Sequence, residues 1–233
     1  MDTVSPRISA LADWAVAGKS LADIGSDHAW LAVDLLVSSR CPQVVVTDIN
    51  PLPLKRAKNM ITRWGLLDKC DFRLGDGLEP LKPGEVATVC IAGMGGQTMA
   101  EILQAAEAKL PSYERLLLQP MNVFKPLRQF LSRSGYPILR ERTVREGAGC
   151  FIILEVGTRM GRPYDLTDLE AEVGPYVLKH PGEYDNCFYL RQWYRKYNNR
   201  LTNMARSSRT QVEEQRQQLE LGLEKLKGVL NEC

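Results

Sequence analysis

Residues that commonly build metal centres and disulfide frameworks are scarce in this sequence. Its 233 residues include only two histidines, His28 and His180, which are far apart in the chain. Six cysteines are present, but no two of them form a Cys-x-x-Cys pair. A zinc site needs a cluster of nitrogen and sulfur ligands, and disulfide-stapled domains are short and dense in cysteine. We therefore expect no metal and no disulfide framework, with Cys70 and Cys90 serving as small apolar side chains in strands.

Long apolar segments and a strong net charge are also missing. No apolar run approaches the roughly 18 residues of a membrane helix, and residues 1–7 lack the basic start and apolar core of a secretory signal. With 44% hydrophobic and 25% charged residues, the composition is typical of a globular protein. These features predict a cytoplasmic protein without membrane contact. The net charge of +2 is too small to indicate a nucleic-acid partner, so such a partner must be argued from local charge.

Strand-like and helix-like segments alternate through the first 135 residues. Short apolar runs predict buried strands, and residues with a helical spacing of apolar positions fall between them. We expect strands at 21–24, 44–48, 70–74, 86–92 and 114–119, and helices at 6–17, 30–36, 51–64, 97–109 and 123–134. This alternation predicts an α/β, Rossmann-like parallel sheet with helices on both faces, whose ligands bind at the carboxyl ends of the strands.

The alternation ends with two consecutive strand-like runs, 136–146 and 150–157, which are separated by a glycine-containing turn. An antiparallel hairpin that closes a parallel sheet is typical of class I methyltransferases. Beyond residue 160 the composition shifts to helix formers with apolar residues three and four apart. We therefore divide the chain into a sheet domain, 1–160, and a helical, coiled-coil-like appendage, 161–233. The appendage is predicted to be two antiparallel helices with a break near Ser207, or one long bent helix.

The turn after the first strand carries the most informative departure from a common motif. Gly25 and Asp48 are 23 positions apart, which matches the distance between the first turn and the ribose-binding acid of dinucleotide-binding folds. However, Ser26 and Asp27 follow Gly25, so the glycines that admit a pyrophosphate are missing and an acid would repel it. The turn therefore favours a ligand with positive groups. The alternative for Asp48 is a helix cap before Pro51.

Asp76 and Gly77 follow the third strand, where a carboxylate can accept a hydrogen bond from an adenine amino group. Ile49 and Leu78 are expected to form the apolar walls of that site. Each of these signals is weak alone, since Asp-Gly most often marks a simple turn. Together with Gly25 and Asp48 they predict an adenosine-binding site.

Three motifs carry a family resemblance. Residues 22–28 (ADIGSDH), 91–96 (IAGMGG) and 118–121 (LQPM), followed by a helical C-terminus, resemble the bacterial tRNA (adenine(22)-N(1))-methyltransferase family. The resemblance implies a class I methyltransferase fold, S-adenosylmethionine as the methyl donor and N1 of a tRNA adenine as the acceptor. It also implies that Ala92, Gly93 and Met94 lie beside the donor.

Adenine N1 already presents an in-plane lone pair, so correct placement of the base could supply most of the acceleration without a strong base. We therefore expect direct in-line transfer, with Asp27 or His28 orienting the acceptor. For His28, a structural role in fixing the turn is the alternative.

The C-terminal part contains a local excess of basic residues. No acidic residue occurs between Asn186 and Val212, where arginines and lysines alternate with aromatic residues. This stripe predicts contact with tRNA, and the alternative is a solvated helix face with the aromatics packed inward. The expected tRNA contacts are Arg7, Gly95, Arg191, Arg195, Lys196 and Arg200, on a monomer or weak homodimer. Alternatives for the whole chain are methylation of another RNA or a protein, a nucleotide-dependent oxidoreductase, or an RNA-binding module without catalysis.

Overall fold

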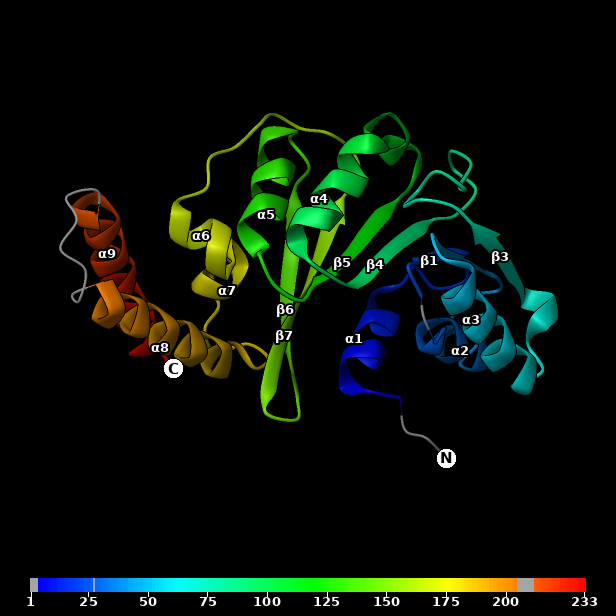
Figure 1. The fold of residues 1–233 in the computed structure, drawn as a ribbon, viewed down its shortest axis with the longest axis horizontal. Helices are drawn as coiled ribbons and strands as arrows, with labels where there is room; N and C mark the ends of the chain where they lie inside the picture. Colours follow the sequence, from blue (N-terminus) through cyan, green and yellow to red (C-terminus); the bar gives the residue numbers. More distant parts are fainter. Residues whose placement is uncertain (1–3, 27, 205–211) are drawn as a thin grey trace.

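The computed structural model describes residues 4–26, 28–204 and 212–233, which form one mixed sheet and a helical extension (Figure 1). The described residues form a sheet of seven strands in the order β3-β2-β1-β4-β5-β7-β6. The strands are β1 (Leu21–Ile24), β2 (Val44–Asp48), β3 (Cys70–Leu74), β4 (Thr88–Met94), β5 (Arg115–Pro120), β6 (Ile138–Glu146) and β7 (Gly149–Gly157). Strands β1 to β5 are parallel, whereas β7 pairs antiparallel with both β5 and β6. The predicted fold class and closing hairpin are therefore confirmed.

Helices cover both faces of the sheet because the strands are apolar on both sides. One hydrophobic cluster contains residues of α1 (Pro6–Trp14), α2 (Trp30–Val37) and α3 (Pro51–Arg63), and the other contains residues of α4 (Gly96–Ala105) and α5 (Phe124–Arg133). Neighbouring residues of β4 contribute to different clusters, with Cys90 in the first and Ile91 in the second. The helix predicted at 97–109 is shorter than expected, because α4 ends at Ala105 and a 3-10 helix, η2 (Glu107–Ser112), follows.

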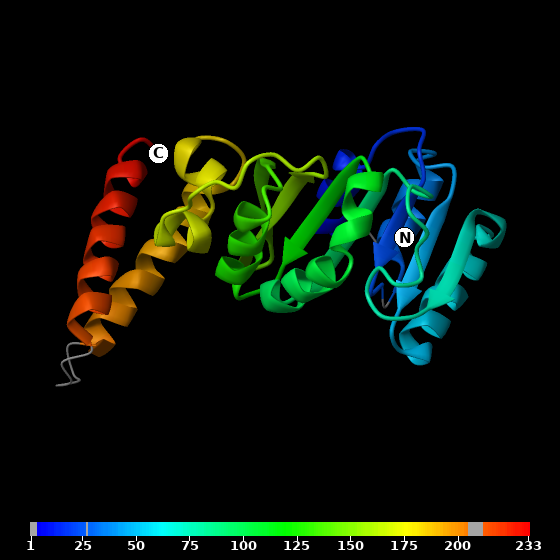
Figure 2. The ribbon, with the colours of Figure 1, turned by 90° about the horizontal axis from the view of Figure 1, so that it is seen from above.

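The C-terminal part contains two short helices and a pair of long ones. These are α6 (Asp168–Val173), α7 (Pro175–Lys179), α8 (Asn186–Met204) and α9 (Val212–Leu230). Helices α8 and α9 lie side by side at the end of the molecule opposite β3 (Figures 1 and 2). The two-helix alternative is confirmed, while the predicted break near Ser207 lies outside the described residues. Trp193, Tyr197 and Leu226 belong to the same hydrophobic cluster as α4 and α5, so the appendage shares a core with the sheet domain.

A buried ion pair joins the sheet domain to the appendage. The guanidinium of Arg128 in α5 contacts Glu141 in β6 at 2.8 Å, and both side chains are fully buried. Arg128 also donates hydrogen bonds to the carbonyls of residues 171, 172 and 173 at the end of α6. Glu141 accepts from the backbone N–H of Tyr176, in the first turn of α7, at 3.0 Å. The Arg128–Glu141 pair therefore connects α5 and β6, which carry the two side chains, to backbone polar groups of α6 and α7.

No disulfide framework was expected, but one disulfide that the sequence did not predict is present. Cys187 in α8 and Cys233, beyond α9, are disulfide-bonded, with Cα atoms 5.8 Å apart. The two cysteines are 46 positions apart, and only the antiparallel arrangement of α8 and α9 brings them together. Spacing in the sequence carried no sign of this pairing. Cys41, Cys70, Cys90 and Cys150 are free.

No helix among the described residues is both long and apolar enough to cross a membrane.

Candidate functional site

The site lies where the strand order reverses, between β1 and β4, at the carboxyl ends of the parallel strands. Gly25 follows β1 with φ of +71°, and its N–H donates to the carbonyl of Thr47 at 2.8 Å. A Cβ atom at this position would collide with the methyl group of Met94. Gly93 also has a positive φ, +80°. The backbone conformation therefore favours glycine at both positions, and a side chain at position 25 would also require the flexible end of Met94 to move.

A cavity of about 330 Å³ opens at the ends of β1, β2 and β3. Its lining brings together six of the predicted cofactor residues, namely Gly25, Asp48, Ile49, Asp76, Gly77 and Met94. We call it the cofactor cavity. Asp48 is buried, and its Oδ1 accepts a hydrogen bond from the N–H of Asn50 at 2.8 Å. Asp48 does not cap α3, whose N-cap is Asn50 without a side-chain cap hydrogen bond, so the helix-cap alternative is wrong.

Leu78 is not a wall of the cofactor cavity. Its side chain is only 1% exposed and belongs to the hydrophobic core, although the residue borders an adjoining hollow beside α4. The side chain turns inward because residues 75–85 fold back over the sheet. The apolar residues that line the cofactor cavity include Ile24, Ile49, Met94 and Ile102, and Ile49 is more than half exposed.

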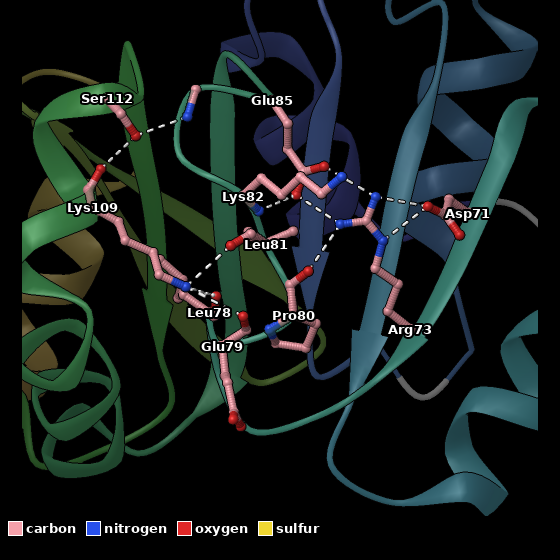
Figure 3. A network of polar contacts seen from close by, with 11 residues as sticks. Asp71, Arg73, Leu78, Glu79, Pro80, Leu81, Lys82, Glu85, Lys109 and Ser112 are labelled. Carbon is pink, nitrogen blue, oxygen red and sulfur yellow. Dashed lines mark hydrogen bonds and ion pairs between the residues drawn. The ribbon is translucent and has the colours of Figure 1, made fainter.

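Two cations hold the loop that carries Asp76 and Gly77 (Figure 3). Arg73 in β3 forms a two-pronged ion pair with Glu85 and donates to the carbonyl of Pro80 at 2.9 Å. The hydrogen bond with Glu85 is the main reason why the pKa of Arg73 is raised. Lys109 Nζ donates to the carbonyls of residues 78, 79 and 81. These contacts hold residues 78–85, which follow the Asp76 and Gly77 lining of the cofactor cavity.

A second cavity, of about 280 Å³, adjoins the first at Gly25 and contains Asp23, His28, Gly93 and Gln119 in its lining. We call it the inner cavity. Asp23 is buried, and desolvation raises its pKa to about 6, although a hydrogen bond with Ser26 acts in the opposite direction. A carboxylate in this environment gains from a nearby positive charge. His28 is exposed at the edge of the same cavity, while Asp27 lies outside the described residues.

Arg7 reaches the inner cavity from α1. Its Nη1 lies 3.3 Å from Oε1 of Gln119 and 3.1 Å from Sδ of Met121. The guanidinium also lies over the ring of Phe151, 4.7 Å from its centroid, and its Nε is 3.8 Å from Glu146. The amide of Gln119 is fully buried, and its Oε1 also accepts from the N–H of Gly93 at 3.2 Å. Gln119 thereby ties α1 to the glycine turn at the end of β4.

Comparison with known proteins places this geometry in a family. A family model described as a methyltransferase domain matches residues 4–154. The tRNA (adenine(22)-N(1))-methyltransferase of Bacillus subtilis is 34% identical over 194 residues, which are 82% of this chain and 79% of the relative. This chain belongs to the bacterial tRNA (adenine(22)-N(1))-methyltransferase family.

Solved structures agree with this family. The crystal structure of the B. subtilis m1A22 tRNA methyltransferase TrmK is 26% identical, with a TM-score of 0.85 over 98% of this chain and 99% of that one. A Streptococcus pneumoniae protein in complex with S-adenosyl-L-methionine is 28% identical, with a TM-score of 0.81 over 98% of this chain and all of the other. The sheet, its closing hairpin and the helical appendage are thus family features.

The predicted tRNA residues fall into two separate groups. Arg7 lines the inner cavity, and Gly95 lies just before α4 without lining either cavity. Arg191, Arg195, Lys196 and Arg200 lie on α8 at the far end of the molecule (Figure 1). Within the second group, Arg200 pairs with Glu172 at 3.1 Å, and Lys196 lies 4.1 Å from the centroid of the Trp193 ring. Desolvation, followed by the charge of Arg200, lowers the pKa of Lys196.

Three aromatic residues of the basic stripe on α8 pack inward, as the alternative interpretation predicted. Tyr189, Trp193 and Tyr197 are buried in the hydrophobic core, and Trp193 makes edge-on contacts with the two tyrosines. They are therefore not a surface on which bases can stack. Arg191 and Arg195, one turn apart, remain exposed.

Two site residues were not singled out from the sequence. Asp23 is an acid inside a four-residue strand that is otherwise apolar, and this inconsistency was a readable signal of function. Gln119 sits in the quoted LQPM motif, but nothing in the sequence indicates that its amide bridges Arg7 and Gly93. That contact joins segments more than 100 positions apart and depends on the fold.

Proposed function

We propose that this protein transfers a methyl group from S-adenosylmethionine to N1 of the adenine at position 22 of tRNA. The observation that carries the proposal is the pair of cavities that meet at Gly25, on the edge of a methyltransferase sheet. Family membership supports the same reaction, since the B. subtilis relative carries that name.

The lining of the two cavities fits a cationic nucleoside donor. Three carboxylates, Asp23, Asp48 and Asp76, lie along it, and Asp23 is held in a desolvated position that favours a positive neighbour. In our proposal Asp48 binds the ribose hydroxyls, while Asp76 and Gly77 contact the adenine ring. Asp23 and the turn at Gly25 hold the amino-acid end. When bound, S-adenosylmethionine supplies an electrophilic methyl group on its sulfonium.

On the acceptor side, the chain has to place a base rather than remove a proton. The lone pair of adenine N1 lies in the ring plane, so alignment is the main requirement. Gly93 and Gly95 leave room for the base near Met94, and Arg7 and Gln119 offer polar groups at the inner cavity. We assign the orientation of the base to Asp27 or His28, and loss of turnover in Asp27→Ala or His28→Ala with unchanged donor binding would identify which one acts.

The basic stripe on α8 is proposed to bind tRNA away from the target base. Arg191 and Arg195 are the best candidates because they are exposed, whereas Arg200 is engaged with Glu172. Charge reversal at Arg191 and Arg195 should weaken tRNA binding and reduce its salt dependence, while donor affinity stays the same. Lys225 and Lys227 on α9 provide matched controls for charge reversal. Equal losses at both pairs of positions would contradict a specific role of the stripe.

The direct test is incubation of unmodified tRNA with labelled S-adenosylmethionine, followed by digestion and nucleoside analysis. The expected product is 1-methyladenosine, and a tRNA with another base in place of adenine 22 should receive no label. Label in another nucleoside, or in protein, would show a methyltransferase with a different substrate. Calorimetry with S-adenosylmethionine and with NAD separates the proposal from an oxidoreductase, because only the first should bind.

A further inference from the structure

The loop that follows β5, residues 121–123, has an unfavourable conformation at its last residue. Val123 adopts the left-handed region, with φ of 50° and ψ of 56°, and it occupies the position just before α5. A β-branched side chain is rarely found there, and the same position normally carries Ser, Thr, Asp or Asn as a helix cap. Val123 makes no side-chain cap hydrogen bond. Neither local backbone preference nor capping therefore explains this valine.

Backbone contacts from the site hold the loop in this conformation. The N–H of Met121 donates to the carbonyl of Met94 at 2.8 Å, and the N–H of Gly96 donates to the carbonyl of Asn122 at 2.9 Å. A Cβ at Gly96 would collide with the carbonyl oxygen of Val123. The turn after β4 is thus built to receive the 121–123 loop directly, and strain of this kind is typical of functional segments.

The loop exposes two apolar side chains to solvent, and one of them, Met121, contacts a residue that lines the inner cavity. Met121 is 40% exposed and Val123 is 56% exposed. Met121 also contacts Arg7, whose Nη1 lies 3.1 Å from its Sδ, and Arg7 lines the inner cavity. Met121 therefore lies next to the groups that are proposed to receive the target base, and Val123 follows it two residues later, just before α5.

We propose that Met121 and Val123 form a wedge that separates the target adenine from its stacked neighbours in tRNA. This inference rests on the proposed function. A base in folded tRNA has to leave its stack before N1 can reach the site, and proteins that unstack bases insert apolar side chains between base steps. The rigid attachment of the loop to Met94 and Gly96 links the position of the wedge to that of the methyl-transfer site.

Val123→Gly separates this role from a structural one. Glycine adopts the left-handed region without steric cost, so the variant keeps the backbone path and loses only the side chain. The unfolding midpoint should stay the same or rise. In contrast, kcat/KM for tRNA should fall roughly ten- to a hundredfold, in line with an unstacking cost of a few kcal/mol per base step. A residue with a purely structural role would not lose activity while stability is kept.

Ser39→Gly is the matched control. Ser39 is also an exposed residue with a left-handed backbone, φ of 56°, but it follows α2 at the opposite edge of the sheet. Its substitution should leave both tRNA kinetics and donor affinity unchanged. Met121→Ala provides a second variant at an unstrained position, and it should also lower kcat/KM for tRNA.

Base extrusion can be observed directly with a tRNA that carries 2-aminopurine in place of the target adenine, because this base brightens when it leaves a stack. Wild-type protein should brighten it, and Val123→Gly and Met121→Ala should brighten it several-fold less at saturating protein. Wild-type methylation of natural tRNA without brightening would overturn the wedge, as would variants that match the wild type in both assays. Failure of the wild type to methylate tRNA at all would instead overturn the proposed function.

Discussion

Arg128→Met tests the joint between the sheet domain and the appendage. The substitution keeps most of the aliphatic volume but removes the guanidinium that contacts Glu141 and three carbonyls at the end of α6. Glu141 would then remain fully buried without its cation. Breaking a buried pair in this way typically costs about 3–5 kcal/mol. Because a typical domain has only about 5–15 kcal/mol of stability, the loss should be large.

The assay is thermal and urea unfolding followed by circular dichroism, with wild type, Arg128→Met, Glu141→Gln and the double variant Arg128→Met/Glu141→Met compared at one pH. For a chain of this size about 3–5 kcal/mol corresponds to a fall in unfolding temperature of roughly 6–20 °C. The double variant should lose less than the sum of the two single losses, because it leaves no unpaired buried charge.

A loss below about 1 kcal/mol in Arg128→Met would refute this reasoning. Such a value is typical of exposed ion pairs and would mean that water reaches Glu141. Gly174 offers an independent check of the same joint. It has φ of +129°, and a Cβ there would run into the carboxylate of Glu141, so Gly174→Ala should also destabilise the joint.

Three further outcomes test the site and the appendage. Burial raises the pKa of Asp23 from 3.8 to about 6, so between these pH values the folded protein keeps a proton that the unfolded chain has lost. The free energy of unfolding in urea should therefore fall as the pH rises through this range. An equal dependence of stability on pH in Asp23→Asn would contradict this. Cys233→Ser removes the disulfide to Cys187 and should lower the free energy of unfolding by up to about 4 kcal/mol. Identical urea midpoints of oxidised and reduced wild type would show that this disulfide contributes nothing to stability. Gly25→Ala should cost about 1–2 kcal/mol of backbone strain and weaken donor binding in calorimetry. Adding Met94→Ala should partly restore donor binding, because it removes the methyl group that the new Cβ would meet. Unchanged donor binding in Gly25→Ala would exclude a close approach of Met94 to Gly25.

Most of the fold could be predicted because its signals are local. Buried parallel strands read as short apolar runs, as in Val44–Asp48, and the hairpin from β6 to β7 is marked by its glycine turn. Contacts between distant segments gave no such signal. The Cys187–Cys233 disulfide and the Arg128–Glu141 pair both depend on how helices pack, and single residues at these positions look ordinary in the sequence.

The same distinction separates the parts of the candidate site. Gly25, Asp48 and Asp76 follow strands whose carboxyl ends must meet in a parallel sheet, so their convergence follows from the fold class alone. Arg7 comes from a helix before the first strand, and its contact with Gln119 requires the exact placement of α1 over the sheet. Arg7 was expected among the tRNA contacts, but the spacing of residues could not place it against Gln119.

The backbone strain at Val123 could not be predicted from the sequence alone. Its strain becomes visible only when the start of α5 is fixed one residue later, since valine before a helix is otherwise unremarkable. Asp23 is different, because an acid within an apolar strand is inconsistent with its surroundings in the sequence itself. Both residues oppose a local preference; Asp23 lines the inner cavity, and Val123 lies two residues after Met121, which contacts Arg7 at that cavity. Strained or desolvated residues at the edge of this sheet are therefore the first positions at which to seek loss of activity without loss of folding.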